Sequence, residues 1–170
     1  MELKETFTNR EGLIVTSRYQ DIESELDFSG KIITGARAYC FHKDKLVIVH
    51  ESKGHWGMPG GAMETNEDVR AGIRREIKEE TNMRVIKMRL FGLIENQKTE
   101  TEYHIWSACF VEPLGEFSSD PAEEITEIKE IDPHEWLTYP GISESNMRKR
   151  IFNRAMQIKS VLDSEAEFSH

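Results

Sequence analysis

Cysteine is scarce in this sequence, and the histidines are scattered. The 170 residues include two cysteines, Cys40 and Cys109, each inside an apolar run and neither in a C-x-x-C pair. A disulfide framework and a cysteine zinc site are therefore not expected, and both thiols are predicted to be buried. The six histidines show no i, i+4 or H-x-H pairing, which argues against a histidine metal site. No Walker loop or dinucleotide fingerprint is present.

Positive charge is also in short supply. The chain carries 22 Lys and Arg against 31 Asp and Glu, a formal net charge of -9. A protein that holds nucleic acid mainly by its phosphates needs clustered basic residues, so stable nucleic-acid binding is not expected. An anionic substrate would need a bound cation, which is often the largest local charge in a site.

Long apolar runs are missing as well. No stretch approaches the length of a membrane span, and the N-terminal MELKETFTNREG lacks the apolar core of a signal peptide. No membrane partner is expected, and a cytoplasmic location is the default expectation.

The length suits one domain with a full core. Residues 1–30 are polar and mixed, with a candidate strand in GLIVTSR and an acidic stretch, DIESELDFSG. They are interpreted as an N-terminal extension that would offer a contact for a homodimer. Residues 31–165 are interpreted as the folded domain and residues 166–170 as a tail.

The order of the expected elements predicts an α+β fold. Two β-rich runs around HKD indicate a hairpin, and its second run, KLVIVHE, is apolar without alternation, as in a strand buried on both faces. PHEW predicts a short turn of helix, and further strands are predicted over 83–96, 102–112 and 124–132. A C-terminal amphipathic helix is indicated by the spacing of Met147, Ile151, Ala155, Ile158 and Leu162. The expected architecture is a sandwich with a mixed β-sheet between helices.

A glycine-rich loop precedes the central helix. Four glycines and a proline in SKGHWGMPGGAMETNED forbid a helix there. The helix is predicted to start near Thr65, which has capping-box spacing to Asp68, or at the alternative cap Asn66. It is predicted to run to about Thr81, with Asn82 ending it in the left-handed conformation.

Three carboxylates crowd the end of this helix, in the string REIKEE (75–80). At about 100° per residue, Glu76 and Glu80 lie about 40° apart around the axis, and Glu79 lies about 60° from Glu76, so all three share one face. Most charged runs of this kind are solvated helix faces. This face, however, begins in the core at Ile73, and partly buried acids need positive partners. A Mg²⁺ ion shared with substrate phosphates would supply that charge.

These residues resemble the signature of the Nudix hydrolases. The signature is Gly, five residues, Glu, seven residues, then Arg-Glu-aliphatic-any-Glu-Glu-any-Gly-aliphatic. The chain reads Gly61, Glu67, Arg75, Glu76, Ile77, Glu79, Glu80, Asn82, Met83. Asn82 stands where the family usually has Gly, and because Asn also tolerates that helix-ending conformation, the departure is expected to affect catalysis little. Upstream, WGMPGG is similar to the family's Trp-x-x-Pro-Gly-Gly lead-in.

The resemblance implies a Nudix-type α/β/α sandwich and a set of site residues. Glu76, Glu79 and Glu80 would ligate Mg²⁺ or Mn²⁺, with the Gly60 carbonyl as a further ligand. Glu67 and Arg75 would lie outside the ligand set of the metal, and Arg75 would orient the glutamates by charge-assisted bonds. The implied reaction is attack of water on a phosphorus of a diphosphate linkage in a nucleoside diphosphate linked to another group.

The resemblance does not identify the general base. One of the helix glutamates is a candidate, and so is a glutamate from the loop after the fifth strand, where the chain offers Glu123, Glu124 and Glu127. The predicted catalytic residues are Glu76, Glu79, Arg75 and Glu124.

The substrate is the property that the sequence determines least. Arg37, at the head of a strand, is a candidate for a phosphate contact, and simple exposure of its side chain explains it equally well. Trp56 is a candidate for stacking on a base, although aromatic residues in strand-like runs more often belong to the core. The expected partner is a small nucleotide. A nucleoside triphosphate cleaved to monophosphate and pyrophosphate is the first hypothesis, and ADP-ribose or a nucleotide sugar is the second. A module that senses a nucleotide without hydrolysing it is a third, and the persistence of all the box glutamates favours an enzyme over it.

Overall fold

The computed structural model describes residues 2–118 and 120–167. Within them the strands form one nine-stranded sheet in the order β1-β2-β7-β8-β3-β4-β5, with β6 paired to β3 and β9 paired to β4. The strands are β1 (Glu2–Thr8), β2 (Ile14–Asp21), β3 (Ile33–His42), β4 (Lys45–Glu51), β5 (Trp56–Gly57), β6 (Gly60–Ala62), β7 (Met83–Gln97), β8 (Thr101–Pro113) and β9 (Ile125–Ile131). The helices are α1 (Val69–Thr81) and α2 (Asn146–Glu167), with short 3₁₀ turns η1 (Glu25–Phe28) and η2 (Pro133–Thr138).

The sheet is mixed, as expected. β3 and β8 run parallel to each other, and the other pairings among the described strands are antiparallel. The predicted hairpin is formed by β3 and β4, which pair as far as His42 opposite Lys45. The short helical turn predicted at PHEW is the start of η2.

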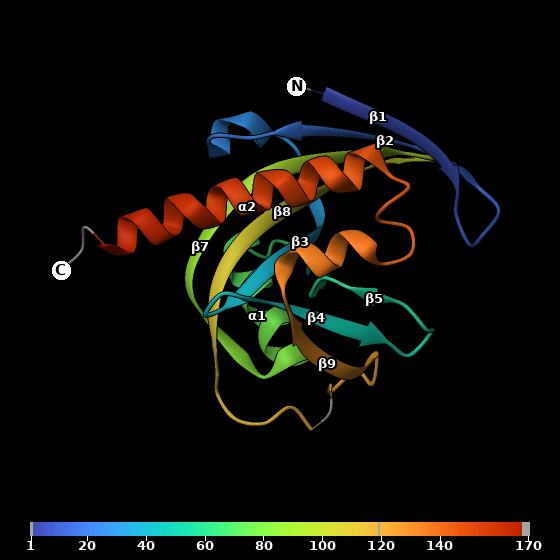
Figure 1. Cartoon of the computed structure of the whole chain (residues 1–170). Coiled ribbons are helices and arrows are strands. Elements are labelled where there is room, and N and C mark those ends of the chain that lie inside the picture. Colours follow the sequence, from blue (N-terminus) through green and yellow to red (C-terminus); the bar gives the residue numbers. More distant parts are fainter. Residues whose placement is uncertain (1, 119, 168–170) are drawn as a thin grey trace.

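The two long helices cover opposite faces of the sheet (Figure 1). α2 packs on the face whose core contains Phe41 and Phe91, and α1 places Ile73 and Ile77 in the core on the other face. All five residues that predicted the C-terminal helix are buried. β4 is buried on both faces, since Ile48 belongs to the α2 side and Val47 to the α1 side. The α+β sandwich is therefore confirmed.

The N-terminal hairpin extends the same sheet. The strand predicted in GLIVTSR is β2, which pairs with β1 on one side and with residues 92–97 of β7 on the other. At the other end, α2 continues to Glu167. Residues 168–170 of the expected tail lie outside the described residues.

The start of α1 corrects the sequence prediction. Neither Thr65 nor Asn66 caps the helix: Asp68 does, accepting a hydrogen bond of 3.1 Å from the Ala71 N–H. Asn66 instead adopts a left-handed turn, with φ of 62°. The end of α1 is as predicted, because Asn82 is left-handed, with φ 54° and ψ 39°.

The two thiols lie opposite each other on the parallel strands, where Cys40 of β3 is level with Cys109 of β8. Both are free and buried, as predicted. No helix in the described residues has the length and apolar character that crossing a membrane requires.

Candidate active site

The site is built where the glycine loop folds back on β3. β6 pairs with β3 so that Gly60 lies opposite Arg37. Gly60 has a φ of 150°, and a Cβ there would come within 2.1 Å of the Ala36 carbonyl oxygen. Only glycine allows this close approach. The Gly60 N–H then donates a hydrogen bond of 3.0 Å to Glu80 Oε2.

Arg75 is the centre of the ion-pair network on α1. Its Nε and Nη2 atoms donate to the two oxygens of Glu67 at 2.8 and 2.9 Å. Its Nη1 donates to Glu76 at 2.9 Å and, more weakly, to Glu79 at 3.4 Å. Nη2 also donates to the Ala62 carbonyl of the glycine loop at 3.2 Å. One guanidinium thus orients three carboxylates and ties them to the glycine loop.

Glu67 lies just before the start of α1 and pairs with Arg75 of that helix. Its Oε1 also accepts the Glu64 N–H at 3.0 Å. The Arg75 guanidinium and this backbone donor lower the pKa of Glu67 to about 2. Glu67 therefore favours the ionised form and fixes the position of the Arg75 guanidinium.

Glu76 faces the glycine loop. A Cβ added to Gly61 would lie 2.8 Å from Glu76 Oε2, so the loop passes directly over this carboxylate. Burial raises the pKa of Glu76, with further contributions from Glu79 and Glu124, while Arg75 opposes the shift. Glu124 is therefore close enough to affect the charge of Glu76.

Glu80 is the most buried of the three helix glutamates, with 5% of its surface exposed. Burial raises its pKa to about 8, and the neighbouring acids Glu76 and Asp120 add to the shift. The Gly60 N–H and the charge of Arg37 act in the opposite direction. Burial and the neighbouring acids therefore disfavour the ionised form of Glu80 more than the Gly60 N–H and Arg37 favour it.

A cavity of about 240 Å³ brings several of the predicted residues together. Arg37, Gly60, Glu80 and Glu124 all line it. Arg37 donates to the Met58 carbonyl at 3.0 Å, and its Nη2 lies 3.8 Å from Glu51. Arg37 and Glu124 thus come from distant parts of the chain to the wall that Glu80 occupies.

Two further cavities contain other residues of the site. One of about 350 Å³ shares Arg37 and Gly61 with it and extends to Glu102 and His104. The other, of about 490 Å³, contains Glu79 and Arg75 and is bounded by Glu116. Glu79 therefore faces a different space from Glu80. Among the described residues, no three acidic, histidine or cysteine side chains already meet around one point.

Trp56 lines none of these three cavities. Its ring packs beside the α2-side core. The ring centroid lies 4.9 Å from that of His50, and Lys129 Nζ lies 4.5 Å from it. The structure places this candidate for base stacking apart from the cavity that contains Arg37.

Sequence reasoning missed Asp120. This residue is 3% exposed. Its carboxylate accepts the backbone N–H groups of Ala122 at 3.2 Å and of Glu124 and Ile125 at 3.1 Å each. Asp120 therefore shapes the turn that presents Glu124 to the cavity. An Asp-Pro pair is a turn signal that could have pointed to it.

The donor set fits a hard divalent cation. Glu76, Glu79 and Glu80 supply carboxylate oxygens, against which the site offers the charges of Arg37 and Arg75. Oxygen donors with an excess of negative charge are what Mg²⁺ and Mn²⁺ prefer. The buried Glu80 carboxylate, which accepts the Gly60 N–H and lies near the acids Glu76 and Asp120, is the donor that such an ion would stabilise most.

Comparisons with known proteins agree on one family. A family model described as NUDIX domain matches residues 32–153. The chain is 25% identical over 153 residues to Nudix hydrolase 6 of Arabidopsis thaliana, covering 84% of this chain and 53% of the relative. The chain thus spans about half the length of that curated relative.

Solved structures show the same fold. A mutant of the Bacillus subtilis pyrophosphohydrolase BsRppH superposes with a TM-score of 0.66 at 16% identity, covering 91% of this chain and 97% of the other. The MutT NUDIX hydrolase from Burkholderia pseudomallei gives a TM-score of 0.54 at 17% identity, covering 71% and 95%. At these identities the likeness concerns the fold.

Proposed function

The chain belongs to the NUDIX family, and from that premise we propose that it hydrolyses a diphosphate linkage in a nucleoside diphosphate linked to another group. The observation that carries the proposal is the convergence of Glu80, Glu124 and Arg37 on one cavity beside the glycine loop. These residues lie far apart in sequence, and a solvated helix face would not require them to meet.

Mg²⁺ or Mn²⁺ would be held by Glu76, Glu79 and Glu80, with the Gly60 carbonyl as a further ligand. Nudix hydrolases are generally dependent on divalent metals. When bound, such an ion neutralises charge on phosphate oxygens and lowers the pKa of a coordinated water. The excess of carboxylates over guanidinium groups at this site supports the assignment.

The remaining residues would position and activate the reactants. Arg75 would hold Glu76 and Glu79 in place by its hydrogen bonds to them, while Glu67 fixes Arg75 through the paired bonds described above. Arg37, in the cavity wall, would contact a substrate phosphate. Glu124 would take the proton from the attacking water, because it shares the cavity with Glu80 and is close enough to influence Glu76.

The substrate proposed first is a nucleoside triphosphate, cleaved to the monophosphate and pyrophosphate. The test is release of phosphate or pyrophosphate from nucleoside triphosphates, oxidised nucleotides, ADP-ribose, nucleotide sugars and dinucleoside polyphosphates, with and without Mg²⁺. Metal-dependent turnover of triphosphates, lost by several orders of magnitude in Glu79→Gln, is the expected result. Turnover of ADP-ribose or a nucleotide sugar instead would move the proposal to that class. Tight binding of a nucleotide without any turnover would refute hydrolysis and indicate a sensing module.

The role of Glu124 has matched controls in the same segment. Glu124→Gln is expected to lower kcat by about 10²-fold or more, the size of a lost general base. Glu123→Gln and Glu127→Gln change exposed residues that do not line the cavity, and they are expected to leave kcat within about twofold. Equal effects of all three substitutions would exclude Glu124 as the base.

A further inference from the structure

The turn between β1 and β2 reaches the candidate active site. Residues 9–13 connect the two strands of this N-terminal hairpin. In Figure 1 this turn and the turn between β4 and β5 project from the same side of the molecule. Arg10 of the first turn and Lys53 of the second both line the cavity of about 240 Å³ that contains Glu80. The hairpin therefore contributes a side chain to the cavity in which the metal-binding and substrate-binding residues were placed.

Hydrogen bonds within the turn hold Arg10 in a defined place. The Asn9 side chain accepts the Glu11 N–H at 3.0 Å and the Leu13 N–H at 2.9 Å. The Asn9 backbone adds two bonds, donating to the Leu13 carbonyl at 2.9 Å and accepting the Gly12 N–H at 3.0 Å. The backbone that carries Arg10 is thus fixed by its own bonds, so little further ordering of the turn is needed when a ligand binds.

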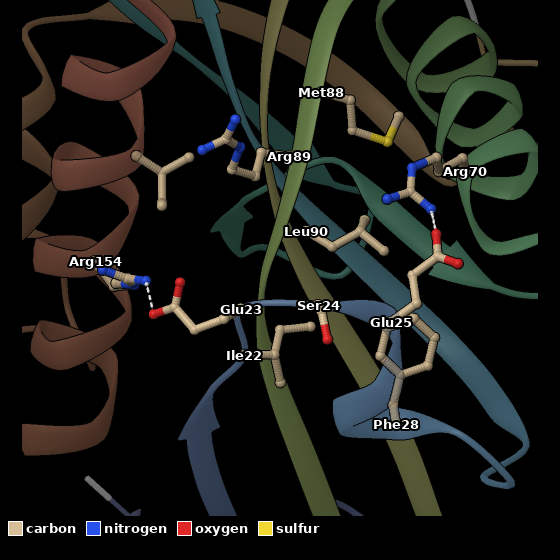
Figure 2. A pocket seen from close by; sticks show the side chains of 11 residues that line it. Ile22, Glu23, Ser24, Glu25, Phe28, Arg70, Met88, Arg89, Leu90 and Arg154 are labelled. Atoms are coloured by element: carbon tan, nitrogen blue, oxygen red, sulfur yellow. Dashed lines mark hydrogen bonds and ion pairs between the residues drawn. The ribbon is translucent and has the colours of Figure 1, made fainter.

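The lack of a partner distinguishes Arg10 from other arginines that line a cavity. Within the described residues its side chain forms no ion pair and no hydrogen bond. By contrast, the three arginines of the cavity shown in Figure 2, at the edge of β7, each have a carboxylate partner. These pairs are Arg70 with Glu25, Arg89 with Glu165 and Arg154 with Glu23. An anion would have to displace a carboxylate from those arginines, but not from Arg10.

The charges around the active-site cavity indicate what Arg10 can bind. The lining residues include three acids, Glu51, Glu80 and Glu124, and three cations, Arg10, Arg37 and Lys53. Arg37 is already engaged, since it donates to the Met58 carbonyl at 3.0 Å and lies 3.8 Å from Glu51. The Arg10 guanidinium keeps all its donors for a ligand, and a guanidinium can bond two phosphate oxygens at once.

Arg10 belongs to a part of the chain that the family match does not include. The NUDIX match begins at residue 32, and the helix glutamates and Arg37 all follow that point. The N-terminal hairpin is joined to the sheet through the pairing of β2 with β7, which fixes where its turn can lie. A contact made by this turn would be a property of the present chain rather than of the signature residues.

We propose that Arg10 binds the diphosphate group of the substrate, so that the N-terminal hairpin forms part of the active site. This role rests on the proposed function. The exposed guanidinium donates to phosphate oxygens and offsets part of the repulsion between the substrate and the acids of the cavity. Because it makes this contact in the bound substrate and in the transition state alike, Arg10 contributes to affinity rather than to kcat.

Inorganic pyrophosphate is the probe for the first experiment, because every candidate substrate contains a diphosphate. The full chain is titrated with it in the presence of Mg²⁺, and binding is followed by calorimetry. Arg10→Gln is expected to weaken binding about tenfold, the size of a lost hydrogen bond to a charged group. Arg10→Lys is expected to weaken it about threefold, since lysine keeps the charge but not the paired donors.

Lys4→Gln is the matched control for this titration. It removes the same charge from an exposed position on β1 of the same hairpin, and Lys4 does not line the cavity. Its affinity is expected to stay within about twofold of the wild type, because solvent and salt screen a distant exposed charge. Equal affinity in Arg10→Gln and the wild type, equal losses in Arg10→Gln and Lys4→Gln, or no binding of pyrophosphate to the wild type would each overturn the proposal.

Asn9→Ala tests whether the turn positions Arg10. The substitution removes the acceptor for the Glu11 and Leu13 N–H groups. It is expected to weaken pyrophosphate binding about threefold in the wild type and to have no effect in the Arg10→Gln background, because the two residues act through one contact. The same loss in both backgrounds would show that Asn9 acts without Arg10, and would contradict the positioning role of the turn.

Turnover separates failure of this inference from failure of the proposed function. With the nucleotide that the chain hydrolyses, Arg10→Gln is expected to raise KM about tenfold and to leave kcat within about twofold. Turnover with an unchanged KM in Arg10→Gln would refute the Arg10 contact alone. Binding of pyrophosphate that depends on Arg10, without turnover of any nucleotide, would refute hydrolysis and support the contact.

Discussion

Asp120→Ala tests whether one buried carboxylate builds the turn that presents Glu124. The wild-type side chain accepts three backbone N–H bonds, from Ala122, Glu124 and Ile125. Each such bond contributes about 1 kcal/mol, and buried donors left without a partner add to the loss. The substitution is therefore expected to lower the free energy of unfolding by about 3 kcal/mol in urea titrations.

Asp120→Asn separates the hydrogen bonds from the volume of the side chain. Its single carbonyl oxygen can take the place of Oδ2, which accepts from Glu124 and Ile125. The amide nitrogen would then face the Ala122 N–H, where no bond can form. The expected loss is about 1–2 kcal/mol. Ser118→Ala, exposed in the same loop, is expected to change stability by less than about 0.5 kcal/mol.

The same variants have an expected kinetic signature. If the turn positions Glu124, Asp120→Ala lowers kcat more than it raises KM, and Asp120→Asn restores part of kcat. A loss of stability below about 1 kcal/mol in Asp120→Ala, or equal losses in the Ala and Asn variants, would refute the reasoning from hydrogen bonds.

Three further substitutions probe the helix carboxylates. Gly61→Ala is expected to lower kcat about tenfold or more, because its Cβ would lie 2.8 Å from Glu76 Oε2; a wild-type kcat would show that Glu76 can move freely. Arg75→Lys is expected to lower the free energy of unfolding by about 2 kcal/mol, since lysine cannot replace the paired bonds to Glu67. The control is Arg74→Lys at the exposed neighbouring position, and an equal loss of stability in the two variants would contradict the role of the Arg75–Glu67 pair. Burial raises the pKa of Glu80 from 4.5 to about 8, so the folded, metal-free protein holds an extra proton between these values. Stability in EDTA should therefore fall as the pH rises from 4.5 to about 8, and an equal slope in Glu80→Gln would refute the assignment.

The sequence predicted those features that depend on local pattern. The end of α1 followed from Asn82, because few residues adopt the left-handed conformation that closes a helix. The burial of β4 on both faces followed from an apolar run without alternation. The shared face of Glu76, Glu79 and Glu80 followed from helical geometry alone.

Local sequence pattern did not predict features that depend on contacts between separate segments. Asp68 rather than Thr65 caps α1, because Glu67 is held by Arg75 eight residues later and the chain at Asn66 turns left-handed. Capping-box spacing could not reveal that tertiary bond. Trp56 was a candidate for base stacking, and only its packing against the α2-side core shows where the ring lies.

By itself the sequence determined the fold class, the family resemblance and the helix that carries the carboxylates, since each rests on residue types at fixed short spacings. Only the tertiary structure decided that Arg37 and Glu124 share a cavity with Glu80, that Asp120 shapes the turn beside it, and that the N-terminal hairpin brings Arg10 to the same cavity. These features depend on strand pairing and on the path of loops between segments that lie far apart in the sequence, and no local periodicity records such contacts.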